Sequence, residues 1–130
     1  MKKGDIFKES FVITDEVYEG FISIFKDYNS LHTDIEYANL KGFRSKVMHG
    51  NILNGFISYF IGECLPVKNV IIQTQQINYS LPVYLKEELI FFAEIVDIFE
   101  SVSTIELKYY FMNSINKKVA KGNIQIGLLK

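Results

Sequence analysis

The stretch NILNGFISYFIGECL, residues 51–65, decides the fold class of this protein. Apolar residues recur through it at the helical period and predict one wide stripe, formed by Ile52, Leu53, Phe56, Ile57, Phe60 and Ile61. Smaller residues fall on another face, at spacings of four, three and four: Asn51, Gly55, Ser58 and Gly62. The 14 residues 52–65 are too few to span a bilayer. We therefore expect a core helix that is buried on one side and closely approached on the other.

The sequence that follows this helix is typical of strands. After Pro66 the apolar period shifts towards two, in segments rich in Ile, Val, Phe and Tyr that cover residues 70–80, 88–100, 102–113 and 117–128. The connections at 100–101 and 113–116 are short enough for hairpin turns, which indicates antiparallel neighbours.

The sequence before the helix is mostly helix and loop. Residues 4–13 predict an opening strand, and Thr14 is placed to cap a helix that runs to the turn formers of 27–30. Residues 33–36 have the Ser/Thr-x-x-Glu form of a capping box, which predicts a short helix ending near Gly42. The element order predicts an α+β domain covering 1–130, an antiparallel sheet folded around one central helix.

The composition of the chain limits the classes of protein to which it can belong. The chain has 130 residues, 48% of them hydrophobic and 22% charged, which is typical of a globular protein with its own core. Its net charge of −1 provides no general attraction to nucleic acid or to an anionic membrane. A single cysteine, Cys64, excludes an internal disulfide and a cysteine-cage zinc site. Because charged residues interrupt the N-terminal segment, we expect no signal peptide and a reduced, cytoplasmic protein.

The candidate chemistry begins in the segment DYNSLHTD, residues 27–34. It places two carboxylates, an amide and an imidazole within eight residues. Asp and His exchange protons near neutral pH, and five residues of irregular backbone can bring Asp27 and His32 to one point. The alternative is structural, because Asp and Asn after a helix are common turn formers and a loop histidine is usually solvated.

A second candidate is the His49-Gly50 pair, where a basic loop meets the apolar helix. The amide of Gly50 can be an unpaired donor at a helix N-terminus, and such donors stabilise a negative oxygen on a carbonyl. The alternative is that Gly50 only starts the helix. A metal site of Asp27, His32, Asp34 and His49 is conceivable, but no HExxH or Cys/His framework supports it and no metal is expected.

The stretch FKDYNSLHTDIEYANLKGFRSKVMHGNIL, residues 25–53, resembles the signature of MaoC-like (R)-specific enoyl-CoA hydratases. The resemblance rests on an Asp-x-Asn-x-x-His core with a downstream His-Gly at a helix start. It continues through LPV at 65–67 and SLPVYLKEEL at 80–89, and so covers nearly the whole chain. Lys26, Ser30 and Lys86-Glu87 depart from the usual Gly, Pro and Gly-Asp, without removing a proposed catalytic group.

This resemblance implies a hot-dog fold, a homodimer, and reversible hydration of trans-2-enoyl thioesters to (R)-3-hydroxyacyl thioesters. It implies an acid/base pair of Asp27 and His32, and a Gly50 amide that polarises the thioester carbonyl. It also implies that Ser58 supports the aspartate; Asn29 is a candidate to fix the loop, and His49 lies beside Gly50. No cofactor is implied beyond the coenzyme A or phosphopantetheine that carries the substrate.

The sequence leaves the role of the basic loop and the choice among related functions open. Lys41, Arg44 and Lys46 are candidates to bind the carrier phosphates, or are an ordinary solvated loop. The first rival function is dehydration of 3-hydroxyacyl chains on acyl carrier protein. More distant rivals are a hot-dog thioesterase and a non-catalytic module that binds acyl thioesters.

Overall fold

The computed structural model describes residues 1–130, and its strands form one antiparallel sheet in the order β1-β3-β4-β5-β2. The strands are β1 (Ile6–Val12), β2 (Val70–Tyr79), β3 (Glu88–Phe99), β4 (Thr104–Met112) and β5 (Lys118–Leu128). The helices are α1 (Asp15–Phe25), α2 (Ser30–Thr33), α3 (Ile35–Leu40) and α4 (Asn51–Tyr59). A π-helical turn (Phe60–Cys64) continues α4, and a 3-10 turn (Glu100–Val102) joins β3 to β4.

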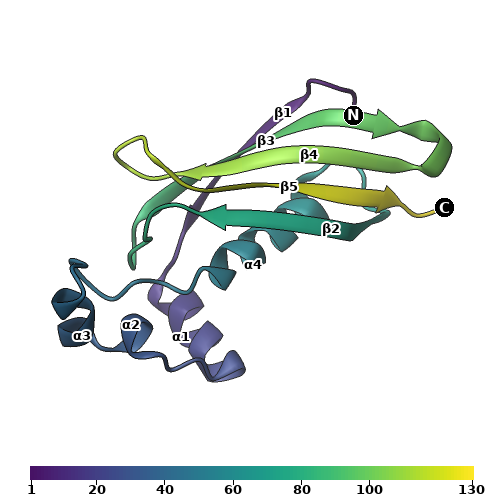
Figure 1. Ribbon diagram of the computed structural model, residues 1–130. Coiled ribbons are helices and arrows are strands. Elements are labelled where there is room, and N and C mark those ends of the chain that lie inside the picture. Colours follow the sequence, from purple (N-terminus) through teal and green to yellow (C-terminus); the bar gives the residue numbers. More distant parts are fainter.

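The sheet curves around α4, while α1, α2 and α3 gather near one end of it (Figure 1). The buried face of α4 carries Leu53 and Ile57, and Phe60 follows in the π-helical turn. These side chains belong to one apolar cluster with inward-facing residues of the sheet such as Phe91 and Phe111. The predicted α+β class and central helix are confirmed. None of the helices combines the length and the apolar character that crossing a membrane requires.

Two predictions about helix ends differ from the structure. The helix predicted over 51–65 is α-helical only to Tyr59, and the next five residues widen into the π-helical turn, which ends before the extended Leu65 and Pro66. The capping box at 33–36 is wrong, because Asp34 caps α3 through its own carboxylate, which accepts from the amides of Glu36 and Tyr37. The Thr33 hydroxyl donates instead to backbone carbonyls upstream.

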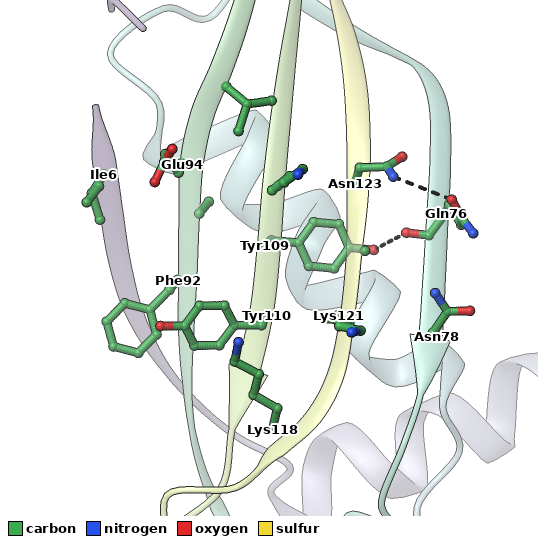
Figure 2. Close-up of a pocket in the computed structure, with 14 residues that line it drawn as sticks. Ile6, Gln76, Asn78, Phe92, Glu94, Tyr109, Tyr110, Lys118, Lys121 and Asn123 are labelled. Carbon is green, nitrogen blue, oxygen red and sulfur yellow. Dashed lines mark hydrogen bonds between the residues drawn. The ribbon is translucent and has the colours of Figure 1, made fainter. Parts of the chain in front are cut away.

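The outer face of the sheet, on the side away from α4, carries a cavity of about 650 Å³ (Figure 2). Phe92 and Tyr110 stack there with ring centroids 5.0 Å apart. At its floor the Tyr109 hydroxyl donates to the Gln76 carbonyl at 2.8 Å, and burial raises the pKa of Tyr109 to about 12. The cavity lining has a single carboxylate, Glu94, and no histidine, so the predicted Asp27–His32 pair is not part of it.

Candidate active site

The end of α1 sets the position of Asp27. Lys26 closes the helix in the left-handed region, with φ 62°, and its amide donates to the Ile22 carbonyl at 2.9 Å. The chain then turns, and the Asp27 carboxylate accepts from the amide of Asn29 at 3.2 Å. The Asn29 side chain in turn caps α2, since its Oδ1 accepts from the Leu31 amide at 3.0 Å. Asn29 therefore holds both ends of the turn that presents Asp27.

His32 lies on the single turn of α2, whereas we expected it in an irregular loop. Its Nδ1 lies 2.7 Å from the carbonyl oxygen of Val47. A carbonyl only accepts, so Nδ1 carries the proton in this bond and the neutral ring keeps a free lone pair on Nε2. The Val47 amide donates to the Leu31 carbonyl at 3.0 Å, so the loop before α4 is tied to α2 by two bonds. The ring orientation of His32 is therefore set by backbone.

His49 lies next to Asp27 and His32 and is 3% exposed. Its Nε2 donates to the backbone carbonyl of Asp27 at 3.0 Å, and its ring lies against that of His32 with centroids 3.9 Å apart. Burial lowers the pKa of His49, and the neighbouring His32 lowers it further, against the opposing effect of the Asp27 carbonyl. Its Nδ1 is buried without a hydrogen-bond partner. A second proton there would have no acceptor among the protein groups, which favours the neutral ring.

The three side chains meet closely, since one polar atom from each of Asp27, His32 and His49 lies within 4.8 Å of the others. One water bridges polar atoms about 5 Å apart, so a separation of this size allows Asp27 and His32 to share a water. These residue types could also hold a metal ion. However, Nε2 of His49 donates to the Asp27 carbonyl, so a metal bound at this nitrogen would have to displace that hydrogen bond. Asp34 is a conceivable fourth ligand, but its carboxylate accepts hydrogen bonds from the backbone at the start of α3.

Gly50 forms the next part of the site, at the start of α4. Together with Asp27, His32 and His49 it lines a cavity of about 460 Å³. No backbone hydrogen bond takes up its amide, which precedes the first turn of α4. A Cβ at this position would lie 2.8 Å from the ring of Tyr79, so glycine is needed for this close approach. The cavity therefore joins an acid–base pair to a free donor at a helix N-terminus.

The cavity lining includes residues that sequence reasoning did not propose for the site, among them Asn51 and Tyr79. The Asn54 amide donates to Asn51 Oδ1 at 2.9 Å and to the Tyr79 hydroxyl at 3.2 Å, and so links the two. Asn51 follows Gly50 directly, and its polar character at a helix start was the available signal. Tyr79 lies at the end of β2, and nothing in its own segment indicated a role.

Five of the residues predicted for the site lie outside the cavity, and one of them is Asn29, which acts instead through the turn that holds Asp27. Ser58 is exposed on α4, about 10 Å further along the helix axis than Asn51, and its hydroxyl forms no hydrogen bond with another residue. Lys41, Arg44 and Lys46 precede the site, and none of them lines the cavity.

Each of these three cations instead lies over an aromatic ring. The Arg44 guanidinium is 3.9 Å from the ring centroid of Tyr84 and within 3.8 Å of the Glu87 carboxylate. The Lys46 ammonium is 4.8 Å from the ring centroid of Tyr18, and Lys41 lies similarly over Tyr37.

Two relatives share part of this sequence. The chain is 24% identical over 109 residues to a mitochondrial 3-hydroxyacyl-[acyl-carrier-protein] dehydratase of Arabidopsis thaliana, which covers 84% of the chain and 64% of the relative. It is 32% identical over 69 residues to an (R)-specific enoyl-CoA hydratase of Aeromonas caviae, which covers 53% and 52%. The matches thus span between half and two thirds of these relatives. No protein-family model matches the chain.

The fold is shared over the full length of known structures. The (R)-hydratase from A. caviae involved in PHA biosynthesis superposes with a TM-score of 0.91 over 99% of this chain and 98% of that one, at 22% identity. A MaoC-like dehydratase from Rhodospirillum rubrum gives 0.81 over 100% and 94%, at 15% identity. These similarities confirm the expected hot-dog fold.

Proposed function

We propose that this chain, a hot-dog-fold relative of the (R)-specific enoyl-CoA hydratases and MaoC-like dehydratases, is a hydro-lyase acting on acyl thioesters. It adds water reversibly to trans-2-enoyl thioesters and forms (R)-3-hydroxyacyl thioesters. One observation carries the proposal: Asp27, His32 and the free Gly50 amide converge on one cavity. The reaction needs no further cofactor, because the thioester is itself the electrophile.

The acid–base pair moves the protons. A water held between Asp27 and His32 gives up a proton to this pair as its oxygen attacks C3 of the enoyl group. His32 is suited to accept it, because the bond from Nδ1 to the Val47 carbonyl leaves Nε2 unprotonated in the neutral ring. The pair then returns one proton to C2, so that one molecule of water is added in total.

The Gly50 amide stabilises the charge that develops during the attack. When oxygen bonds to C3, electrons move through C2 to the thioester oxygen, which becomes an enolate. A backbone N–H at a helix N-terminus stabilises such an oxygen by about 2.7–4 kcal/mol. Gly50 is placed for this role, because its amide opens α4 and borders the same cavity as the pair.

The direct test is the loss of enoyl absorbance when purified protein is mixed with crotonyl-CoA and longer trans-2-enoyl-CoA substrates. We expect hydration with (R) stereochemistry. Absence of turnover at every chain length, on coenzyme A and on acyl carrier protein, would refute the proposal. Release of free thiol without hydration would identify a thioesterase, and binding without turnover a non-catalytic module.

Dehydration of 3-hydroxyacyl chains on acyl carrier protein is the second candidate, and the likeness to the Arabidopsis dehydratase favours it. Both directions use the same residues, so the carrier distinguishes them. Comparing kcat/KM for the same acyl group on coenzyme A and on acyl carrier protein decides between them. A cytoplasmic location belongs to the proposal, and cell fractionation tests it.

The three basic residues of the preceding loop provide a separate prediction about the carrier. If Arg44 and Lys46 contact its phosphates, the double charge reversal Arg44→Glu/Lys46→Glu raises KM with little change in kcat. Lys41→Glu extends the test to the third cation. An unchanged KM would leave these residues with their aromatic partners as a surface feature.

A further inference from the structure

The ring of Tyr79, at the end of β2, lies against Gly50, at the start of α4. A Cβ on Gly50 would be 2.8 Å from Cε1 and 2.9 Å from Cζ of this ring, and the hydroxyl oxygen is bonded to Cζ. Figure 1 shows the end of β2 near the first turn of α4. Both residues line the cavity that contains the acid–base pair. A hydroxyl is therefore present close to the amide that we assign to the thioester oxygen.

This hydroxyl accepts a hydrogen bond but donates none within the chain. Nδ2 of Asn54 donates to it at 3.2 Å, and it forms no other hydrogen bond with a residue of the protein. A phenol oxygen can accept one hydrogen bond and donate another at the same time. Burial raises the pKa of Tyr79, so the hydroxyl keeps its proton at neutral pH. That proton is available to a ligand in the cavity.

Asn54 holds the hydroxyl in place. Its Nδ2 donates both to Tyr79 and to Oδ1 of Asn51, the latter at 2.9 Å, and its own Oδ1 accepts from Gln75 on β2. Three partners define one orientation of this amide group. Asn54 also lies one helical turn after Gly50, so it is on the same face of α4. The hydroxyl is therefore oriented before any substrate binds, which makes it effective in stabilising charge.

We propose that the Tyr79 hydroxyl is a second hydrogen-bond donor to the thioester oxygen, beside the Gly50 amide, and that Asn54 is its positioning residue. This inference rests on the proposed function and adds a catalytic residue to it. Two N–H or O–H donors that share one oxygen lie roughly 4–6 Å apart. The contact of the Tyr79 ring with Gly50 is compatible with such a separation.

The role of Tyr79 is to stabilise charge without transferring a proton. As the water oxygen bonds to C3, the electron pair of the C2–C3 double bond forms a C1–C2 double bond. The carbonyl pair then moves onto the thioester oxygen, and both donors stabilise this enolate. When C2 takes up a proton, the pairs return and the carbonyl is restored. Tyr79 keeps its own proton throughout, so the acid–base pair alone moves protons.

The test removes the hydroxyl and leaves the ring. Tyr79→Phe keeps the contact with Gly50, and Asn54→Ala removes the positioning bond, alone and in the Tyr79→Phe background. Tyr110→Phe is the matched control, because Tyr110 lies on the outer face of the sheet and outside the site cavity (Figure 2). Each variant is assayed for kcat and KM with crotonyl-CoA, and urea unfolding checks its folding. Asn54→Ser replaces Asn54→Ala if that variant does not fold.

A spectroscopic measurement reports the hydrogen bonds to the carbonyl directly. The conjugated thioester 2,4-hexadienoyl-CoA absorbs at longer wavelength when its carbonyl oxygen is polarised. We would bind it in the Asp27→Asn background, where hydration is slow, with and without Tyr79→Phe. A residue with a purely structural role would not change this absorbance maximum.

We expect Tyr79→Phe to lower kcat at least tenfold, towards the roughly 10²–10³-fold loss that removal of one such donor causes, with KM within about threefold. The red shift of the bound dienoyl thioester should also decrease. Asn54→Ala should lower kcat when the Tyr79 hydroxyl is present and have little further effect when it is absent, because it acts through that hydroxyl. Tyr110→Phe should match the wild type.

A loss of kcat smaller than tenfold in Tyr79→Phe, or an unchanged red shift, would overturn the inference and leave the hydratase proposal intact. Equal losses from Asn54→Ala in both backgrounds would overturn the positioning role of Asn54. A wild-type protein inactive on every substrate would instead refute the proposed function.

Discussion

At the residue scale, His49 is the side chain whose surroundings explain most about the site. Its Nε2 donates to the Asp27 carbonyl, its ring lies against His32, and its Nδ1 is buried without a partner. The residue therefore stabilises the turn that carries Asp27 and limits the movement of His32. Its surroundings favour the neutral form, because a second N–H on Nδ1 would be buried without an acceptor.

A dependence of stability on pH follows from this environment. Burial keeps the pKa of His49 in the folded protein below its ordinary value of 6.5. Below that pH the unfolded chain takes up the proton more readily than the folded one, so the free energy of unfolding falls on acidification. Above it both states are neutral and the effect vanishes. Urea unfolding between about pH 8 and pH 5 measures the slope.

The matched variant for this measurement is His49→Gln, which keeps an N–H donor for the Asp27 carbonyl but does not titrate. Its unfolding free energy should vary less steeply with pH than that of the wild type. His32→Gln serves as the comparison, because it removes the other histidine and leaves His49 in place. A slope that His49→Gln leaves unchanged would show that His49 does not cause the acid sensitivity.

The acid–base pair provides the sharpest test of function at this scale. Asp27→Asn keeps the size and the hydrogen bond from Asn29 but loses the carboxylate, so activity should fall by roughly 10²–10⁴-fold. His32→Gln should have a similar effect. The double variant should lose far less than the product of the single effects, because both groups act on one water.

The controls for the pair are folding and metal dependence. Circular dichroism should show intact secondary structure in all three variants. A chelator should leave wild-type activity unchanged, since the proposed chemistry uses no metal. If Asp27 is only a turn residue, asparagine is an excellent replacement and activity should be nearly intact.

At the scale of elements, the end of α1 and the start of α4 place the chemistry. Both ends point their site residues at one cavity, Asp27 from the first and Gly50 from the second. The C-terminal end of α1 is imperfect, because Lys26 occupies a left-handed conformation that favours glycine. This is one of the positions where the sequence departs from the hydratase pattern.

Lys26→Gly should therefore stabilise the protein by about 0.5–1 kcal/mol. The substitution removes the steric cost that lysine pays in the left-handed conformation. Part of this gain is lost, because glycine has more conformational freedom in the unfolded chain. Urea unfolding measures it. Ser103→Gly is the control, since Ser103 also has a positive φ, of 51°, but lies in the β3–β4 connection. If Ser103→Gly stabilises and Lys26→Gly does not, the left-handed cap of α1 has another source of stability.

At the scale of the whole molecule, the sheet leaves two edges, β1 and β2. The outer edge of β2 extends over ten residues, and Ile71 on it is 52% exposed. Edges of this length promote pairing with another strand. The homodimer that the hydratase resemblance implies would protect this edge by continuing the sheet from one subunit into the next.

We therefore expect a dimer in solution, and expect Ile71→Lys to shift it towards monomer, because charge at an edge opposes pairing. Light scattering after size exclusion measures both. Ile115→Lys is a suitable control, since Ile115 is 67% exposed in the turn between β4 and β5. A wild-type monomer, or a dimer that tolerates lysine at position 71, would contradict edge pairing through β2.

The sequence by itself determined the elements and the location of the chemistry along the chain. Strand and helix periods are local, so the four long strands after α4, the cap at Thr14 and the central helix could be predicted from nearby residues. The candidate residues Asp27, His32 and Gly50 were also identifiable, because residue type and short spacing carried the resemblance.

Only the tertiary structure decided how those residues are held. Whether Thr33 or Asp34 caps α3 depended on which backbone groups lay within reach of each side chain. The stacking of His49 on His32 and the approach of Tyr79 to Gly50 join residues 17 to 29 positions apart, and no periodic pattern encodes such contacts. Ser58 lies on the expected helix, yet it is about 10 Å further along the helix axis than Asn51 and so lies outside the cavity. Local sequence determines an element's type, whereas packing between distant segments determines which side chains meet.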